Sequence, residues 1–453
     1  MRMPAEFSQR LAWYGGATLF FFKKMKNVAA IPQDREQSWL KKLGPGLITG
    51  AADDDPSGIA TYSQAGAQFG FNMLWTVLLT YPLMVGIQMV SARIGRVSGH
   101  GLATNIRRHY PTWLLYSVVG LLLIANTINI AADVSAMGEA LKLIIGGPAA
   151  LYAVAFGVLS LVLQVFVPYR RYVRILKWLT LTLLAYVATA FVVHIPWSQV
   201  LLKALLPQLS WKPAYITTVV AVFGTTISPY LFFWQASQEV EEQLADPYAQ
   251  PLIKAPQQAK ANLRRIKIDT CIGMGFSNLV AFFIILTTAV TLNLHGISDI
   301  QTSAQAALAL RPIAGDFAFM LFSAGIIGTG LLAIPVLAAS SAYAMAGAFH
   351  WENSLECGPM RAKRFYGIIA VSTLIGIALG FTAIDPIKAL YWSAVINGVI
   401  SVPIMALMML MALRPQIMGQ FVISTRLTVL GWLATLLMAA AVAAMLLTVF
   451  GTA

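Results

Sequence analysis

Three consecutive aspartates, Asp53, Asp54 and Asp55, interrupt a stretch that otherwise has the composition of a membrane-spanning helix. Small and apolar residues precede them, and Pro56 follows directly. An ionisable side chain at the centre of a bilayer costs about 2.5–3.5 kcal/mol on insertion scales. A span that keeps three of them beside a helix-breaking proline is expected to use their charge, and a cation is the natural partner of carboxylates.

The composition places most of this chain in a bilayer. Hydrophobic residues make up 58% of the 453 residues and charged residues 11%, and the mean hydropathy is +0.72. A soluble domain carries about 25% charged residues. The length accommodates about eleven spans of ~20–25 residues, so we predict an all-α polytopic membrane protein. The predicted spans are 44–66, 72–95, 113–143, 149–168, 173–195, 213–242, 267–293, 316–348, 365–383, 387–413 and 426–450.

The net charge of +13 follows the predicted topology. With a cytoplasmic N-terminus, 26 of the 31 lysines and arginines fall inside, as the positive-inside rule requires. Eleven spans then place the C-terminus outside. This distribution disfavours nucleic acid as a partner, and we interpret the acidic run at Glu239, Glu241 and Glu242 as a solvated helix end. The basic residues that remain outside are Lys142, Lys203, Lys212, Arg311 and Lys388.

Two predicted spans are interrupted at their middles. The first breaks at 55–58 and the sixth at 224–230, each around a proline, which removes a helix hydrogen bond. Breaks five spans apart predict two five-span repeats of opposite orientation, with an ion site at the unwound segments. We therefore predict a LeuT-type fold of five plus five helices with discontinuous helices 1 and 6. The predicted parts are a cytoplasmic tail (1–43), the first repeat (44–195), the inverted repeat (196–413) and an additional C-terminal helix (414–453).

Several segments resemble the NRAMP family of divalent-metal transporters. Gly44-Pro45-Gly46 is followed by eight residues and then Asp55-Pro56, and 130–138, 300–306 and the stretch from Asn397 to Pro403 also resemble family segments. The resemblance implies a secondary transporter that works by alternating access in the plasma membrane. It implies a divalent metal ion as substrate, no catalytic activity, no cofactor, and a monomer or weak dimer.

The departures from the family pattern concern the ion. Gly58 stands where members carry a coordinating asparagine, and Ser228 stands where they carry a methionine. A hydroxyl in place of a soft sulfur suits Mg²⁺, Ca²⁺ or Mn²⁺, and Mg²⁺ keeps several of its waters. The sequence is most similar to the NRAMP-related magnesium-transporter branch, which implies Mg²⁺ as substrate with Mn²⁺ as a second ion.

Other departures concern protons. Tyr230 replaces the family histidine, and Ala136 replaces the glutamate three residues after Asp133. We expect uncoupled flux, for which the membrane potential supplies about 2.3 kcal/mol per charge per 100 mV. The alternative is a proton-coupled Mn²⁺/Fe²⁺ symporter of ordinary NRAMP type. An amino-acid carrier is disfavoured because the aspartates would repel a carboxylate, and an aspartyl protease because no Gly-x-Gly-Asp signature is present.

The candidate site residues come from both breaks and from two other spans. Asp55 is the strongest candidate ligand. Successive helical residues point about 100° apart, so all three aspartates cannot face one ion, and the others are weaker candidates. Asp133 is assigned to the ion pathway, because buried ionisable residues in membrane spans are functional by default. The remaining predicted ligands are Asp54, Thr225, Ser228, Tyr230 and Asn397.

Overall fold

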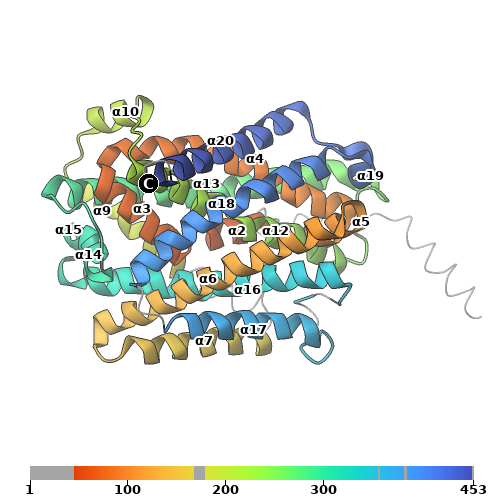
Figure 1. Ribbon diagram of the computed structural model, residues 1–453, viewed down its shortest axis with the longest axis horizontal. Helices are drawn as coiled ribbons and strands as arrows, with labels where there is room; N and C mark the ends of the chain where they lie inside the picture. The colour runs from red at the N-terminus through yellow and green to blue at the C-terminus, as the bar shows by residue number, and fades with distance from the viewer. Residues whose placement is uncertain (1–44, 168–178, 353, 356–357, 382–384, 451–453) are drawn as a thin grey trace, which may run out of the picture. The chain divides into compact units, whose positions relative to one another are not determined.

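The computed structural model describes residues 45–167, 179–352, 354–355, 358–381 and 385–450. Within these residues, all regular secondary structure is helical (Figure 1). The predicted tail 1–43 lies outside the described residues, and so does the start of the predicted fifth span.

The first predicted break is present in the structure. Helix α2 (Pro45–Asp53) ends at the aspartates, and α3 (Pro56–Phe69) begins after them. Asp55 is the N-cap of α3, and its carboxylate accepts a hydrogen bond from the Gly58 N–H at 2.7 Å. Pro56 occupies the first turn, where its missing N–H costs nothing. The aspartates therefore lie at the junction of two half-helices and not within a continuous helix.

The second predicted break is also present. Helix α11 (Pro213–Thr226) ends before Ile227, and α12 (Pro229–Ala245) begins after Ser228. Pro229 again stands in the first turn of the second half-helix. The freed carbonyl of Ile227 accepts a hydrogen bond from Ser401 at 2.8 Å, so a neighbouring helix satisfies part of the unwound backbone.

Each remaining predicted span corresponds to one helix. The helices are α4 (Leu74–Ser98), α6 (Thr112–Ile145), α7 (Ala149–Phe166), α9 (Leu184–Val192), α13 (Ala259–Thr291), α16 (Ala318–Phe349), α17 (Lys363–Leu379), α18 (Pro386–Ala412) and α20 (Thr425–Phe450). Short α-helices connect them: α5 (Leu102–His109), α10 (Trp197–Leu205), α14 (Ser303–Ala307), α15 (Arg311–Ala314) and α19 (Pro415–Met418). The 3-10 turns are η3 (Gly70–Met73), η4 (Leu179–Leu183), η5 (Pro256–Gln258), η6 (Asn293–His295), η7 (Leu308–Leu310), η8 (Gly315–Phe317) and η9 (Gly419–Phe421).

By length and composition, eight helical stretches in the described part of the chain can each cross a membrane, or nine if α9 and α10 form one bent span. The predicted number was eleven. Three features explain the difference. Helices α3 and α4 follow each other without a gap and count as one stretch of 43 residues. Helix α17 has 17 residues, fewer than the shortest of the eight. Helices α9 and α10 meet at an angle of 120°.

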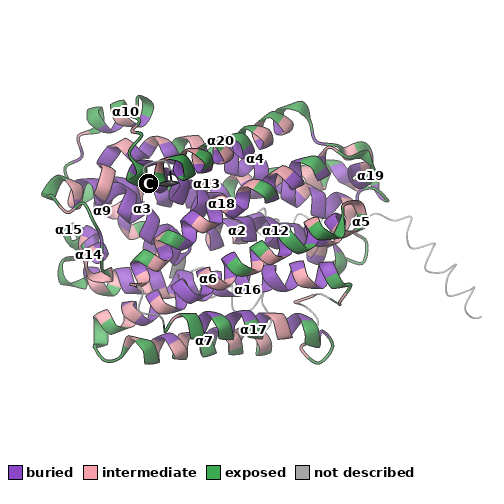
Figure 2. Cartoon of the chain, viewed as in Figure 1, coloured by how far each residue is buried: buried purple, intermediate pink, exposed green. Residues whose placement is uncertain are grey.

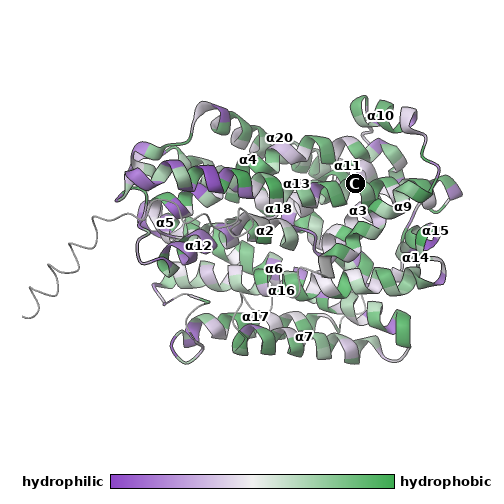
Figure 3. Ribbon diagram, turned by 180° about the vertical axis from the view of Figure 1, so that it is seen from behind, coloured by the Kyte–Doolittle hydropathy of each residue, from purple (hydrophilic) through white to green (hydrophobic). Residues whose placement is uncertain are grey.

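The broken helices lie in the interior of the helical body. An apolar window of 18 residues within α11 and α12 is entirely buried, and Figure 2 shows many exposed residues on outer helices such as α7. Helix α6 packs along α16, and α7 and α17 pack against α6 on its outer side (Figure 1). Apolar residues dominate the long helices, whereas hydrophilic residues gather around α5 and the end of α12 (Figure 3).

Candidate metal centre

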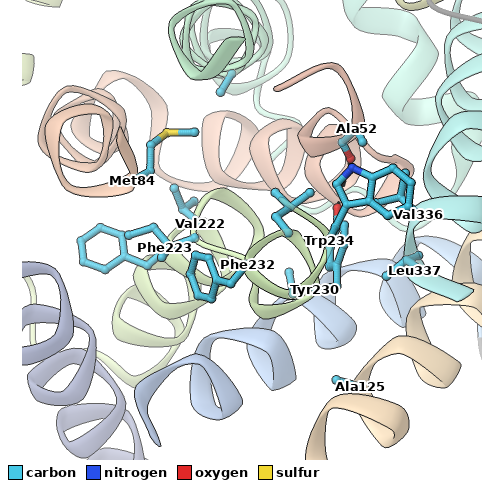
Figure 4. Packing of buried hydrophobic residues seen from close by; sticks show 14 of the residues in the cluster. Ala52, Met84, Ala125, Val222, Phe223, Tyr230, Phe232, Trp234, Val336 and Leu337 are labelled. Carbon is cyan, nitrogen blue, oxygen red and sulfur yellow. Dashed lines mark hydrogen bonds between the residues drawn. The ribbon is translucent and has the colours of Figure 1, made fainter. Parts of the chain in front are cut away.

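The Asp55 carboxylate lies between the two broken helices. One oxygen accepts the Gly58 N–H of α3, and the other, Oδ2, accepts the Tyr230 hydroxyl of α12 at 3.3 Å. The same hydroxyl is 3.1 Å from the carbonyl oxygen of Ala52 in α2. Figure 4 shows Tyr230 in the packed interior, with Ala52 nearby. Asp55 is 2% exposed. Its buried carboxylate is therefore fixed by one hydrogen bond from each broken helix, from Gly58 of α3 and from Tyr230 of α12.

Asp53 and Asp54 are oriented by a different helix. The Ser277 hydroxyl of α13 lies 2.5 Å from Asp53 Oδ2 and 3.0 Å from Asp54 Oδ1. The second oxygen of each carboxylate has no hydrogen-bond partner among the described residues. The structure thus separates the roles of the three aspartates: Asp55 bonds to α3 and α12, whereas its two neighbours bond to α13.

Thr225 and Ser228 differ in how free their hydroxyl groups are. Thr225 Oγ1 is buried and has no partner in the described structure. Ser228 Oγ lies 2.9 Å from the Gly224 carbonyl and 2.8 Å from the Thr225 carbonyl, so its hydroxyl donates a hydrogen bond to the backbone of its own segment. Its oxygen keeps lone pairs for a cation. A Cβ on Gly58 would lie 3.3 Å from Thr225 Oγ1 and 3.5 Å from Asp55 Oδ1, which places Asp55 and Thr225 around one small space.

Asp133 and Asn397 also have unpaired buried oxygens. Both carboxylate oxygens of Asp133, and Oδ1 of Asn397, lack a hydrogen-bond partner in the described residues. The Asp133 charge interacts with Asp55 and with Tyr230, which brings α6 to the site. Asn397 precedes Gly398, which packs on α11 at Gly224. The structure places Asn397 near the second break but records no contact between its side chain and Asp55.

The described residues contain no group of three or more histidines, cysteines, aspartates and glutamates arranged to hold a metal. A cation at Asp55 would need hydroxyl, carbonyl or amide oxygens, or water, to complete its shell. Two serines that the sequence analysis missed support the site: Ser277 orients two aspartates, and Ser401 bonds the carbonyl of Ile227. A single serine in an apolar span has no spacing signal that would have revealed either.

One protein-family model matches most of this chain. The family model "Natural resistance-associated macrophage protein-like" (Nramp) matches residues 46–448. A curated relative, the divalent metal cation transporter MntH of Yersinia enterocolitica serotype O:8 / biotype 1B, is 28% identical over 312 residues, which cover 66% of this chain and 71% of the relative.

Solved structures share the fold. A manganese transporter of Eremococcus coleocola, in complex with an aromatic bis-isothiourea compound, superposes with a TM-score of 0.70 at 18% identity and covers 93% of this chain and 90% of its own. MhsT with L-phenylalanine gives a TM-score of 0.54 at 13% identity, covering 89% and 98%. Mhp1 in a closed conformation gives 0.52 at 15%, covering 90% and 93%. This likeness confirms the predicted LeuT-type fold.

Proposed function

This chain belongs to the Nramp family of divalent-metal transporters, and from that premise we propose that it carries Mg²⁺ by an uncoupled alternating-access mechanism, with Mn²⁺ as a second substrate. Family membership makes it a multi-pass membrane transporter and not an enzyme. We further propose a plasma-membrane location with the N-terminus in the cytoplasm and the C-terminus outside, and a monomer or weak dimer as the working unit.

The observation that carries the proposal is the set of donors around Asp55. Among the described residues, the side-chain groups beside it include the Tyr230 hydroxyl and, across the space at Gly58, the Thr225 hydroxyl, which are hard oxygens, whereas the Gly58 N–H orients the carboxylate. Hard oxygen ligands suit Mg²⁺ and Mn²⁺. Gly58 contributes no side chain, so water can occupy the space beside Asp55, and Mg²⁺ binds with several waters retained.

The proposal of uncoupled flux rests on the groups near Asp55 that can titrate. Histidine is the side chain whose unperturbed pKa lies between pH 5 and 8, and Tyr230 occupies the position after Pro229 instead. Helix α6 brings Asp133 to the site, but Ala136 supplies no second carboxylate one turn away; the other carboxylates beside Asp55 are Asp53 and Asp54, which share the Ser277 hydroxyl. The inside-negative potential is sufficient to drive a divalent ion, since it supplies about 2.3 kcal/mol per charge per 100 mV.

The proton-coupled Mn²⁺/Fe²⁺ symporter remains the second candidate, and one contact favours it. Met137, one turn after Asp133 on α6, has its sulfur against Gly330 of α16, and a carbon of Pro56 approaches the same glycine. A thioether near the first break is a soft ligand of the kind that selects transition metals. The named relatives are likewise manganese or divalent-metal transporters.

Flux into proteoliposomes separates the two candidates. Purified protein would be reconstituted with trapped indicators for Mg²⁺, Mn²⁺ and pH, and compared with Asp55→Ala. Asp316→Ala, which removes an exposed carboxylate outside the site, is the matched control. We expect Mg²⁺ uptake that Asp55→Ala abolishes, that Asp316→Ala leaves unchanged, and that does not alter internal pH. Uptake of Mn²⁺ alone, accompanied by acidification, would establish the second candidate instead.

A further inference from the structure

One face of α6 carries three polar side chains in the middle of the helix. Asn126, Asn129 and Asp133 are spaced by three and four residues, so they lie along a single face. Each is 0% exposed. Helix α6 contacts α3 and α12, and Met137, one turn after Asp133, lies beside the same glycine as Pro56, so this polar face begins near the candidate metal centre and continues along α6 toward α5.

The three side chains differ in whether their polar atoms have hydrogen-bond partners in the protein. The Asn126 amide nitrogen lies within hydrogen-bond distance of the Leu337 carbonyl (3.0 Å) and of the hydroxyls of Ser340 (2.8 Å) and Ser341 (2.9 Å). By contrast, neither amide atom of Asn129 and neither oxygen of Asp133 has a partner among the described residues. Leaving a buried polar group unpaired costs about 1–3 kcal/mol, and more for a charged group.

The packing of α16 explains why no protein partner reaches them. The helices run antiparallel: the Ser323 hydroxyl bonds the Ala140 carbonyl at 2.7 Å, Met137 meets Gly330, and Asn126 meets Ser340. Between these contacts, α16 presents only the apolar residues 331–336. This segment of α16 therefore offers no polar side chain to Asn129 and Asp133, which have no partner among the described residues, and water or a cation is the remaining kind of partner.

We propose that Asn129 and Asp133 form a second oxygen-ligand site that holds the divalent cation on its way to or from Asp55. The proposal rests on the proposed transport of Mg²⁺ and deepens it. A carboxylate and an amide oxygen four residues apart lie about 6 Å apart along the helix axis and face the same way. Both are ligand types that Mg²⁺ and Mn²⁺ accept. Asn126, fixed by α16, marks the far end of this polar face.

The first test removes the amide oxygen at nearly constant volume. Asn129→Leu should lower the maximal rate of Mg²⁺ uptake about tenfold, the effect of removing one polar contact of ordinary strength, while binding at Asp55, measured by calorimetry, persists. Thr127→Val is the matched control, because the Thr127 hydroxyl bonds only the Leu123 carbonyl of its own helix at 2.7 Å. This control should transport at the normal rate.

The second test does not depend on transport activity. In a background of Cys271→Ser and Cys357→Ser, the thiol of Asn129→Cys should react with a small hydrophilic methanethiosulfonate, and saturating Mg²⁺ should slow that reaction. The thiol of Thr127→Cys should show no protection by Mg²⁺. A normal flux in Asn129→Leu, or an unreactive or unprotected thiol at position 129, would overturn the second site while leaving Asp55-dependent transport intact. Absence of Mg²⁺ flux in the unaltered protein would instead overturn the proposed function.

Discussion

Gly58 controls the space beside the Asp55 carboxylate. Its missing Cβ would lie 3.3 Å from Thr225 Oγ1, 3.3 Å from the Tyr62 ring and 3.5 Å from Asp55 Oδ1. A larger side chain at this position would point between the two oxygens that we expect to face the ion. The space is small, so it can hold a water beside the carboxylate only if position 58 has no side chain, and Mg²⁺ is an ion that retains water.

Filling this space should change the ion preference. Gly58→Asn would introduce an amide oxygen beside Asp55 and displace water, which favours an ion that dehydrates more readily than Mg²⁺. We expect the ratio of Mg²⁺ to Mn²⁺ uptake to fall about tenfold, the scale on which one altered contact discriminates between substrates. Gly58→Ala separates the effect of bulk from that of the amide. Competition of Mg²⁺ against radioactive Mn²⁺ would measure the ratio, and an unchanged ratio in Gly58→Asn would refute this role of Gly58.

Candidate residues that lie within the two helix breaks could be identified from the sequence. Residues of other helices that pack against the breaks could not. Asp55 and Tyr230 stand beside prolines that mark the two interruptions, so their proximity follows once the helices are paired. Ser277 and Ser401 lie in apolar helices without any motif, and their importance depends on which residues α13 and α18 present to the breaks. Nothing local in the sequence encodes that choice. The ion-binding and pathway roles of all seven candidate residues remain predictions.

At the level of elements, α11 and α18 cross with their backbones in close approach. A Cβ on Gly224 would overlap the Ala394 carbonyl and the backbone of Gly398. Small residues at such crossings allow membrane helices to pack tightly. The crossing lies immediately before the second break, so it fixes the position of Thr225 and Ser228 relative to α18.

Gly224→Ala should therefore destabilise the protein. Overpacking of a close contact costs about 1–3 kcal/mol, which we expect as a lower thermal unfolding temperature in detergent. Gly120→Ala is the control, because no atom lies within 4 Å of the corresponding Cβ position. Unfolding of Gly224→Ala at the normal temperature would mean that the two helices can separate at no cost, contrary to the packing described above.

The element boundaries were less predictable than the breaks. The fifth span was predicted over 173–195, and its described part contains η4 and α9; the chain then turns by 120° into α10, which the prediction did not include. Pro196, the N-cap of α10, stops the first helix, and α10 then presents Leu201 and Leu205 outward. A hydropathy pattern records apolar content and not direction, so it could not reveal this bend.

At the scale of the whole molecule, a network of charged residues on α13 connects α2, the first half of one broken helix, with α12, the second half of the other. Arg265 of α13 contacts Glu239 at 2.5 Å and Glu242 at 3.1 Å, both on α12, and lies 3.6 Å from Asp269. Asp269 in turn accepts the Gly46 N–H of α2 at 2.9 Å. Glu239 is fully buried, and Glu241 is buried and accepts the hydroxyls of Tyr343 and Ser354, so our interpretation of the acidic run as a solvated helix end was wrong for these two residues. The partner of Glu239 is 26 positions away in the sequence, beyond the reach of any local pattern.

Removing Arg265 alone should lower the stability of the fold more than removing Arg265 and Glu239 together. Arg265→Gln leaves Glu239 buried without its cation, and removing one member of a buried pair costs about 3–5 kcal/mol. The double variant Arg265→Gln with Glu239→Gln removes both charges and should recover most of the lost unfolding temperature. Lys142→Gln, which breaks the exposed pair with Glu139, should change stability by at most about 1 kcal/mol.

The double variant also tests whether this network limits transport. If the proposed alternating-access cycle separates the ends of α2 and α12 from α13, the Arg265 contacts oppose that step, because they hold these helices together. If separation limits the rate, the double variant should transport faster than the unaltered protein while retaining its dependence on Asp55. Recovery of stability without faster flux would assign the network a structural role only. A double variant no more stable than Arg265→Gln would show that the buried charge of Glu239 is not what destabilises the single variant.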